Sequence, residues 1–161
     1  MKKFLVIGNP IEHSLSPTLH NYWIKNNGID ANYEKQKLHE SELEQIIEDI
    51  KKEKINGVNV TVPFKKVIIP FLDELSVEAE KTQSVNTLYL KNKKVIGHNT
   101  DIIGFETSIK ESKFNIFNKE VLILGAGWVV PSIIFALNKM KVSKIKTFFF
   151  SRLYTEFLIL V

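Results

Sequence analysis

Short apolar runs alternate with amphipathic stretches through residues 1–100. Five runs have the length and composition of strands: residues 3–7, 31–38, 57–62, 85–90 and 94–99. The last two flank a polar turn and predict a hairpin. Two stretches between the runs have one apolar helix face each, carried by Leu19, Tyr22 and Trp23 and by Leu43, Ile46, Ile47 and Ile50. This alternation predicts an α/β domain with a mixed, largely parallel sheet covered by helices.

The pattern starts again after residue 100. A helix beginning at Asp101 precedes a polar linker over residues 112–119, and a strand over 120–124 then runs into a glycine turn. The following helix places four apolar residues on one face, and a strand over residues 145–150 ends the pattern: Val130, Ile133, Ile134 and Leu137 form that face. We expect the first βαβ half of a Rossmann-like domain, and therefore two domains, 1–100 and 101–161.

Composition narrows the class of protein. Of the 161 residues, 44% are apolar and 25% are charged, the balance of a globular protein with a core. Cysteine is absent and the four histidines lack ligand-pair spacing, so we expect no disulfide and no metal site. The net charge of +4 is spread over lysines interleaved with glutamates, a pattern that argues against nucleic-acid binding.

The apolar ends of the chain do not match targeting or membrane segments. The run over residues 3–7 stops at Gly8, too early for a secretory signal. The apolar tail is interrupted by Arg152 and Glu156 and is shorter than a membrane span. We therefore expect a cytoplasmic protein without a membrane segment.

Several polar residues stand where strands or loops meet helices. Ser14 and Ser16 precede a helix whose N-terminus favours an anion such as a carboxylate, although Ser16 followed by Pro17 also fits a helix N-cap. Lys65 lies in the first turn of a short helix, where an opposing acid would stabilise its charge. Asp101 offers that acid at another loop-to-helix junction, where it also fits an N-cap. Asn86 at a strand start closes a turn or holds a ligand hydroxyl.

Five segments together carry a family resemblance. In order and spacing, "GNPIEHSLSPTLHN", "GVNVTVPFKK", "QSVNTLYL", "IGHNTDIIGF" and "LILGAG" resemble segments of shikimate dehydrogenase, the NADP-dependent enzyme of aromatic amino-acid biosynthesis. The resemblance covers Met1 to about Ile145. It implies a small-molecule substrate, shikimate or 3-dehydroshikimate, and a protein that is a monomer or a homodimer.

The resemblance also assigns roles to the substrate-site residues. It implies that Ser14 and Ser16, with Thr61, hold the substrate carboxylate. Asn86 then takes a ring hydroxyl, as does Asp101. The resemblance further implies that Lys65 reaches the reacting oxygen of the substrate and forms an acid–base pair with Asp101.

For the cofactor NADP, the resemblance points to the glycine loop and one arginine. Gly125, Ala126 and Gly127 would let the backbone approach the pyrophosphate beside a helix that begins near Trp128. Arg152 would contact the 2′-phosphate. Trp128 and Val130 depart from the family pattern, which has small residues at both positions.

The tail is the largest departure. Family members run on for about another hundred residues, which complete the nucleotide-binding sheet. From about Lys146 the resemblance fades into an apolar tail without a clear period, as in the product of a truncated or frameshifted gene. Two functions stay open: an active shikimate dehydrogenase, or a non-catalytic remnant that binds shikimate at most. A quinate/shikimate dehydrogenase is a near variant of the first.

Overall fold

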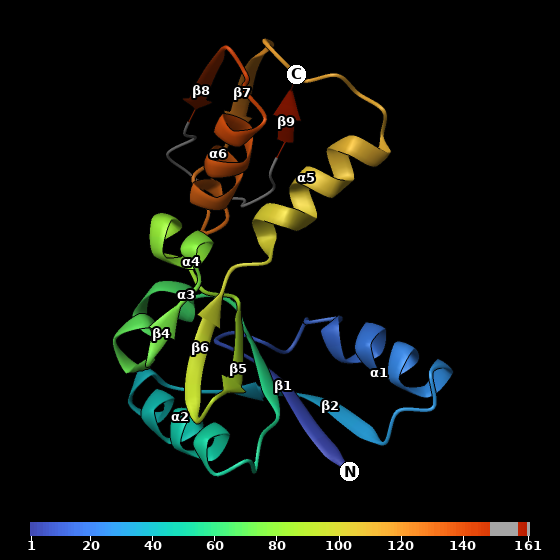
Figure 1. Ribbon diagram of the computed structural model, residues 1–161, viewed down its shortest axis with the longest axis vertical. Coiled ribbons are helices and arrows are strands. Elements are labelled where there is room, and N and C mark those ends of the chain that lie inside the picture. Colours follow the sequence, from blue (N-terminus) through green and yellow to red (C-terminus); the bar gives the residue numbers. More distant parts are fainter. Residues whose placement is uncertain (149–157, 161) are drawn as a thin grey trace. The chain divides into compact units, whose positions relative to one another are not determined.

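The computed structural model describes residues 1–148 and 158–160. The chain forms two compact units, Met1–Asn99 and Thr100–Val161, whose elements are labelled in Figure 1. Among the residues that the structure describes, no helix combines the length and the apolar composition needed to cross a membrane.

The first unit contains a six-stranded sheet in the order β2-β1-β3-β5-β6-β4. Its strands are β1 (Lys2–Gly8), β2 (Ala31–Lys37), β3 (Gly57–Val60), β4 (Glu74–Leu75), β5 (Thr87–Lys91) and β6 (Lys94–His98). β1 pairs in parallel with both β2 and β3, and β4 pairs in parallel with β6. β5 is antiparallel to β3 and to β6, with which it forms the predicted hairpin. The predicted mixed, largely parallel sheet is confirmed.

Helices alternate with these strands along the chain. They are α1 (Ser16–Asn26), α2 (Leu43–Lys51), α3 (Phe64–Val67) and α4 (Val77–Thr82), with short 3₁₀ helices at Glu40–Glu42 and Ile69–Phe71. All four apolar residues predicted for one face of α2 are buried. They pack with Leu5 and Ile7 of β1 in the main core, where each buried aliphatic side chain contributes about 1.5–3 kcal/mol. The short β4 and α4 were not predicted from the sequence.

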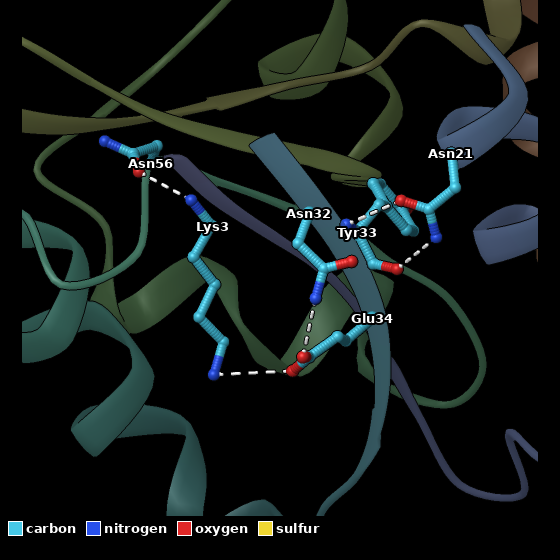
Figure 2. Close-up of polar contacts among 6 residues, drawn as sticks. All are labelled: Lys3, Asn21, Asn32, Tyr33, Glu34 and Asn56. Atoms are coloured by element: carbon cyan, nitrogen blue, oxygen red, sulfur yellow. Dashed lines mark hydrogen bonds and ion pairs between the residues drawn. The ribbon is translucent and has the colours of Figure 1, made fainter. Parts of the chain in front are cut away.

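α1 forms where the sequence predicts a helix, but its apolar face is not buried. Leu19, Tyr22 and Trp23 keep 48%, 62% and 49% of their surface exposed, and no residue of α1 is buried. Ile24 packs against the buried cluster that includes Tyr33, and Figure 2 shows a polar contact beside it: the Asn21 side chain accepts from the backbone N–H of Tyr33 at 3.0 Å and donates to its carbonyl at 2.8 Å. Asn21 thus satisfies backbone groups on the open edge of β2, as a neighbouring strand would.

Side chains also fix the start of β1. The backbone N–H of Lys3 donates to the Asn56 side chain at 2.8 Å, and the Lys3 ammonium lies 3.4 Å from Glu34 (Figure 2). The Glu34 carboxylate in turn accepts from Asn32 at 2.8 Å. These contacts join β1 to β2 and to the loop before β3, in addition to the ladder bonds.

The second unit contains the predicted βαβ motif. Its elements are α5 (Asp101–Glu111), β7 (Glu120–Leu124), α6 (Val130–Lys139), β8 (Lys144–Phe148) and β9 (Leu158–Leu160). β7 and β8 are parallel neighbours, and β9 lies antiparallel on the other side of β7. The apolar face of α6 packs on β7 through Val121 and Ile123, with Phe105 and Ile109 of α5 against the same core. The end of the predicted strand, residues 149 and 150, lies outside the described residues.

A buried charge joins α5 to α6. The Glu106 side chain is 4% exposed, and the Lys139 ammonium lies 2.9 Å from its Oε1 and donates to its Oε2 at 3.1 Å. A carboxylate in an apolar core is stable only with such a partner. The ion pair therefore holds the two helices together.

Replacing Lys139 by methionine keeps the aliphatic stem and removes the cation from Glu106. We expect the free energy of unfolding to fall by about 1–3 kcal/mol, because a buried charged group loses its partner. Urea denaturation measures the change, with Lys141→Met, a nearby exposed lysine, as the matched control. An equal effect of the two substitutions would contradict the role of the ion pair.

Candidate functional site

A pocket of about 360 Å³ lies at the edge of the first sheet where β1 and β3 end. Its lining is formed by residues of β1, of the loops after β1 and β3, and of the first turn of α1: Val6, Pro10, Ile11, His13, Ser14, Ser16, Thr61 and Val62. Because β1 and β3 are parallel neighbours, the loops that follow them meet at the same edge. The pocket thereby brings together Ser14, Ser16 and Thr61, three residues predicted to bind one carboxylate.

The two loops approach each other closely at Gly8. The N–H of Asn9 donates to the Val62 carbonyl at 2.9 Å, and the N–H of Thr61 donates to the Ile7 carbonyl at 3.0 Å. A Cβ on Gly8 would lie 2.7 Å from the Thr61 methyl group and 3.0 Å from the Val62 carbonyl oxygen. Glycine is therefore required here for the loops to close over the pocket.

The helix cap predicted at Ser16 is wrong. The N-cap of α1 is Leu15, whose backbone is already near helical, so Ser16 is the first helical residue and its hydroxyl does not cap the helix. The Ser14 hydroxyl instead accepts from the N–H of Ser16 at 3.3 Å. No acidic side chain lies in the first turn of α1. The half-buried serines and the helix N-terminus therefore form a suitable environment for an anion.

Glu12 anchors the loop that carries Ser14. Its carboxylate accepts from the N–H of Ile11 at 3.0 Å and from the Lys37 ammonium at 3.1 Å, while Lys35 donates to its backbone carbonyl. The backbone N–H of Glu12 itself, followed by Lys37 and Ile11, lowers the pKa of this carboxyl from 4.5 to about 2. Sequence reasoning missed Glu12, because its lysine partners lie on a strand far along the chain.

Backbone hydrogen bonds bring the Lys65 segment beside Asn86. The N–H of Val85 donates to the Lys65 carbonyl at 2.8 Å, and the N–H of Val60 donates to the Asn86 carbonyl at 2.9 Å. Lys65 is half-buried in α3, which begins directly after Pro63 as predicted. Backbone hydrogen bonds thus hold the start of β5 against the end of β3 and the start of α3.

Asn86 lies just before β5 and is held by several groups. Its N–H donates to the His98 carbonyl at 3.0 Å, and its side-chain Oδ1 accepts from the Thr87 hydroxyl at 3.0 Å. The side chain is half-buried. These bonds orient the amide at the sheet edge, and a contact of Asn86 with a ligand hydroxyl stays a prediction.

Asp101 is the first residue of α5 and belongs to the second unit. The N-cap of α5 is Thr100, so the alternative of an Asp101 cap is wrong. Asn99 ends the first unit as a buried residue, and its side chain donates to the Thr82 hydroxyl at 3.0 Å. This anchor, which sequence reasoning missed, fixes the backbone that leads to Asp101. The pairing of Asp101 with Lys65 stays a prediction.

The glycine loop has the backbone that a diphosphate site needs. Gly125 has a φ of 119°, which side-chain-bearing residues rarely adopt, and its N–H donates to the Phe148 carbonyl at 2.9 Å. Gly125–Gly127 has no side chain larger than that of Ala126, Trp128 follows it in the connection to α6, and the first turn of α6 carries no acid. The loop therefore fits a pyrophosphate. α6 begins at Val130 rather than near Trp128, and the predicted 2′-phosphate contact, Arg152, lies outside the described residues.

Val130, which stands where the family pattern has a small residue, is accommodated in the core. Its side chain is buried and packs in the core of the second unit, and its N–H donates to the Gly127 carbonyl at 3.0 Å. Trp128 is half exposed on the loop. Of the two residues that are larger than in the family pattern, Val130 lies in the core and Trp128 is half exposed to solvent.

The depressed pKa of Glu12 predicts a pH dependence. Glu12 stabilises the folded chain fully above pH 4.5, and this contribution disappears as the pH falls towards about 2. The difference in free energy of unfolding between the wild type and Glu12→Gln should shrink over that interval. Denaturation at a series of pH values measures it, with Lys37→Met as the background that reduces the effect. A difference that stays constant or grows towards low pH would contradict the anchor.

The sequence of this chain is similar to those of known proteins. Residues 6–88 match the family described as the shikimate dehydrogenase substrate binding domain. The chain is 63% identical over 144 residues to shikimate dehydrogenase (NADP(+)) from Pelagibacter ubique, which covers 89% of this chain and 54% of the relative. The chain spans about half the length of the curated relatives that it matches.

Solved structures show the same relation. The structure of shikimate dehydrogenase from Aquifex aeolicus is 40% identical with a TM-score of 0.82, over 92% of this chain and 55% of that one. Shikimate 5-dehydrogenase from Thermus thermophilus, solved in complex with NADP(H) and shikimate, is 30% identical with a TM-score of 0.83, over 91% of this chain and 56% of that one. With the family match over the pocket and the sheet that forms it, this chain belongs to the shikimate dehydrogenase family.

Proposed function

We propose that this chain acts as an NADP-dependent shikimate dehydrogenase, interconverting 3-dehydroshikimate and shikimate in aromatic amino-acid biosynthesis. One observation carries the proposal: Ser14, Ser16 and Thr61, which come from two distant segments, line a single pocket. The named relatives support the same activity. In this proposal residues 1–100 bind the substrate and residues 101–161 bind the cofactor, in a cytoplasmic monomer or homodimer.

The substrate carboxylate lies in the pocket, where the hydroxyls of Ser14, Ser16 and Thr61 donate hydrogen bonds to it. Charge-assisted bonds of this kind are about twice as strong as neutral ones. The N-terminus of α1 adds a favourable electrostatic contribution. Asn86 and Asp101 then contact ring hydroxyls and fix the orientation of the ring.

Lys65 and Asp101 manage the proton of the reacting oxygen. A bound NADP would supply the redox chemistry, taking a hydride from the alcohol carbon in oxidation and giving one to the ketone in reduction. During oxidation the hydroxyl proton passes to Lys65, which is the free amine before the transfer and the ammonium after it, and Asp101 pairs with that ammonium. In reduction the ammonium returns the proton to the oxygen. The Lys65 ammonium stabilises negative charge on that oxygen, while the Asp101 carboxylate orients the ammonium.

The backbone of Gly125, Ala126 and Gly127 would hold the pyrophosphate of the cofactor. The positive φ of Gly125 and the short side chain of Ala126 leave the loop open to a phosphate. Arg152 would select NADP over NAD through the 2′-phosphate.

A second candidate function is shikimate binding without catalysis. It is favoured by one observation: the residues that line the substrate pocket all lie within residues 6–62, so the pocket could bind shikimate without the glycine loop. The two candidates differ in turnover and share shikimate affinity.

The test is NADPH formation by the purified 161-residue chain with shikimate and NADP, compared with quinate as substrate. We expect Lys65→Ala to lower kcat by about 10²–10⁴-fold and to leave KM nearly unchanged, because the lysine acts on the reacting oxygen. Lys66→Ala, the exposed neighbour in α3, is the matched control and should keep wild-type turnover.

Loss of kcat in Lys66→Ala equal to that in Lys65→Ala would contradict the catalytic role of Lys65. A wild type without turnover that shikimate still protects against thermal unfolding would establish the second candidate instead. Both functions would be refuted if shikimate neither protected the wild type against thermal unfolding nor gave NADPH with it.

A further inference from the structure

A chain of hydrogen bonds crosses the first sheet from β2 to the start of β5. The Tyr33 hydroxyl of β2 donates to Oδ1 of Asn59 in β3 at 2.6 Å. The Asn59 amide donates to the Thr87 hydroxyl at 3.2 Å and to the Asn86 carbonyl at 3.3 Å. The Thr87 hydroxyl then donates to Oδ1 of Asn86 at 3.0 Å. The chain therefore begins under α1 and ends on a residue of the proposed substrate site.

The start of this chain is held rigidly. Tyr33 is 4% exposed, and the His20 ring stacks on it with centroids 4.2 Å apart and an interplanar angle of 2°. Asn21 bonds both backbone groups of Tyr33. Burial raises the pKa of Tyr33 to about 12, so its hydroxyl keeps its proton and remains a donor.

Each member fixes the direction of the next bond. A protonated Tyr33 hydroxyl requires the oxygen of the Asn59 amide to face it, and the NH₂ group of Asn59 must then face Thr87. Thr87, which accepts that bond, has one proton of its own and places it on Oδ1 of Asn86. The Asn86 oxygen is thereby committed to Thr87, and its NH₂ group lies on the other branch of the amide.

We propose that Tyr33, Asn59 and Thr87 are positioning residues that fix the amide of Asn86 so that its NH₂ group donates to a substrate ring hydroxyl. The inference rests on the proposed function, which gives Asn86 that contact. Without the chain, the Asn86 oxygen would lose the Thr87 hydroxyl, and the orientation of the amide that suits the substrate would be less strongly favoured. None of the three residues needs to touch the substrate.

The first experiment measures shikimate affinity of the full chain by calorimetry. Tyr33→Phe removes one hydroxyl from the start of the chain, and we expect about a tenfold weaker affinity, the loss of one hydrogen bond. In an Asn86→Ala background the same substitution should have no further effect, because Tyr33 acts through Asn86. Tyr89→Phe is the matched control: Tyr89 lies on β5 and lines the same pocket of about 510 Å³ as Tyr33, outside the chain of bonds.

A loss of affinity that is equal in the wild-type and Asn86→Ala backgrounds would indicate a general structural effect and overturn the inference. Unchanged affinity in Tyr33→Phe would overturn it as well.

A second measurement does not depend on shikimate. The side-chain NH₂ signals of Asn86 in a ¹⁵N–¹H spectrum, assigned by their loss in Asn86→Ala, should shift or broaden in Tyr33→Phe and Thr87→Val but not in Tyr89→Phe. Unchanged signals would overturn the positioning role. Changed signals in a chain without shikimate affinity would support positioning and refute the substrate contact, which separates this inference from the proposed function.

Discussion

The parallel pairing of β1 with β3 is the constraint on which the rest of the site depends. It sends the loops after both strands to one edge of the sheet, where Ser14 of the first loop and Ser16 at the start of α1 meet Thr61 of the second loop. Gly8 makes the close approach of these loops sterically allowed. A side chain at that position would separate the hydroxyls that the pocket brings together, although none of them would itself be altered.

Polar contacts then determine how precisely the site is held. Glu12 fixes the first loop to the lysines of β2, and the bonds from Tyr33 to Thr87 reach the Asn86 amide from the opposite direction. Both sets of contacts begin on β2, the edge strand of the sheet. β2 contributes no residue to the lining of the pocket, but it supports the site in two ways. Lys37 anchors the loop of Glu12, and Tyr33 begins the bonds that lead to the Asn86 amide.

The sequence predicted those features that follow from local periodicity. The buried face of α2, the β5–β6 hairpin and the βαβ motif of the second unit were all visible as spacings of apolar residues. For α1 the spacing predicted which residues share a face, but it did not show that this face stays exposed, because exposure depends on whether another element covers it. The anchors Glu12 and Asn99 could not be predicted, since their partners are set by tertiary contacts between distant segments. The polar Asn59 within an apolar β3 was the available signal for the chain of bonds.

The central claim is that this pocket recognises a carboxylate. Calorimetric titration of the full chain with shikimate and with its methyl ester tests it most directly, because the ester keeps the ring and its hydroxyls and loses only the negative charge. The account predicts binding of shikimate and at least about tenfold weaker binding of the ester, the loss of one charge-assisted hydrogen bond. Equal affinity for the two compounds, or no binding of shikimate, would contradict it.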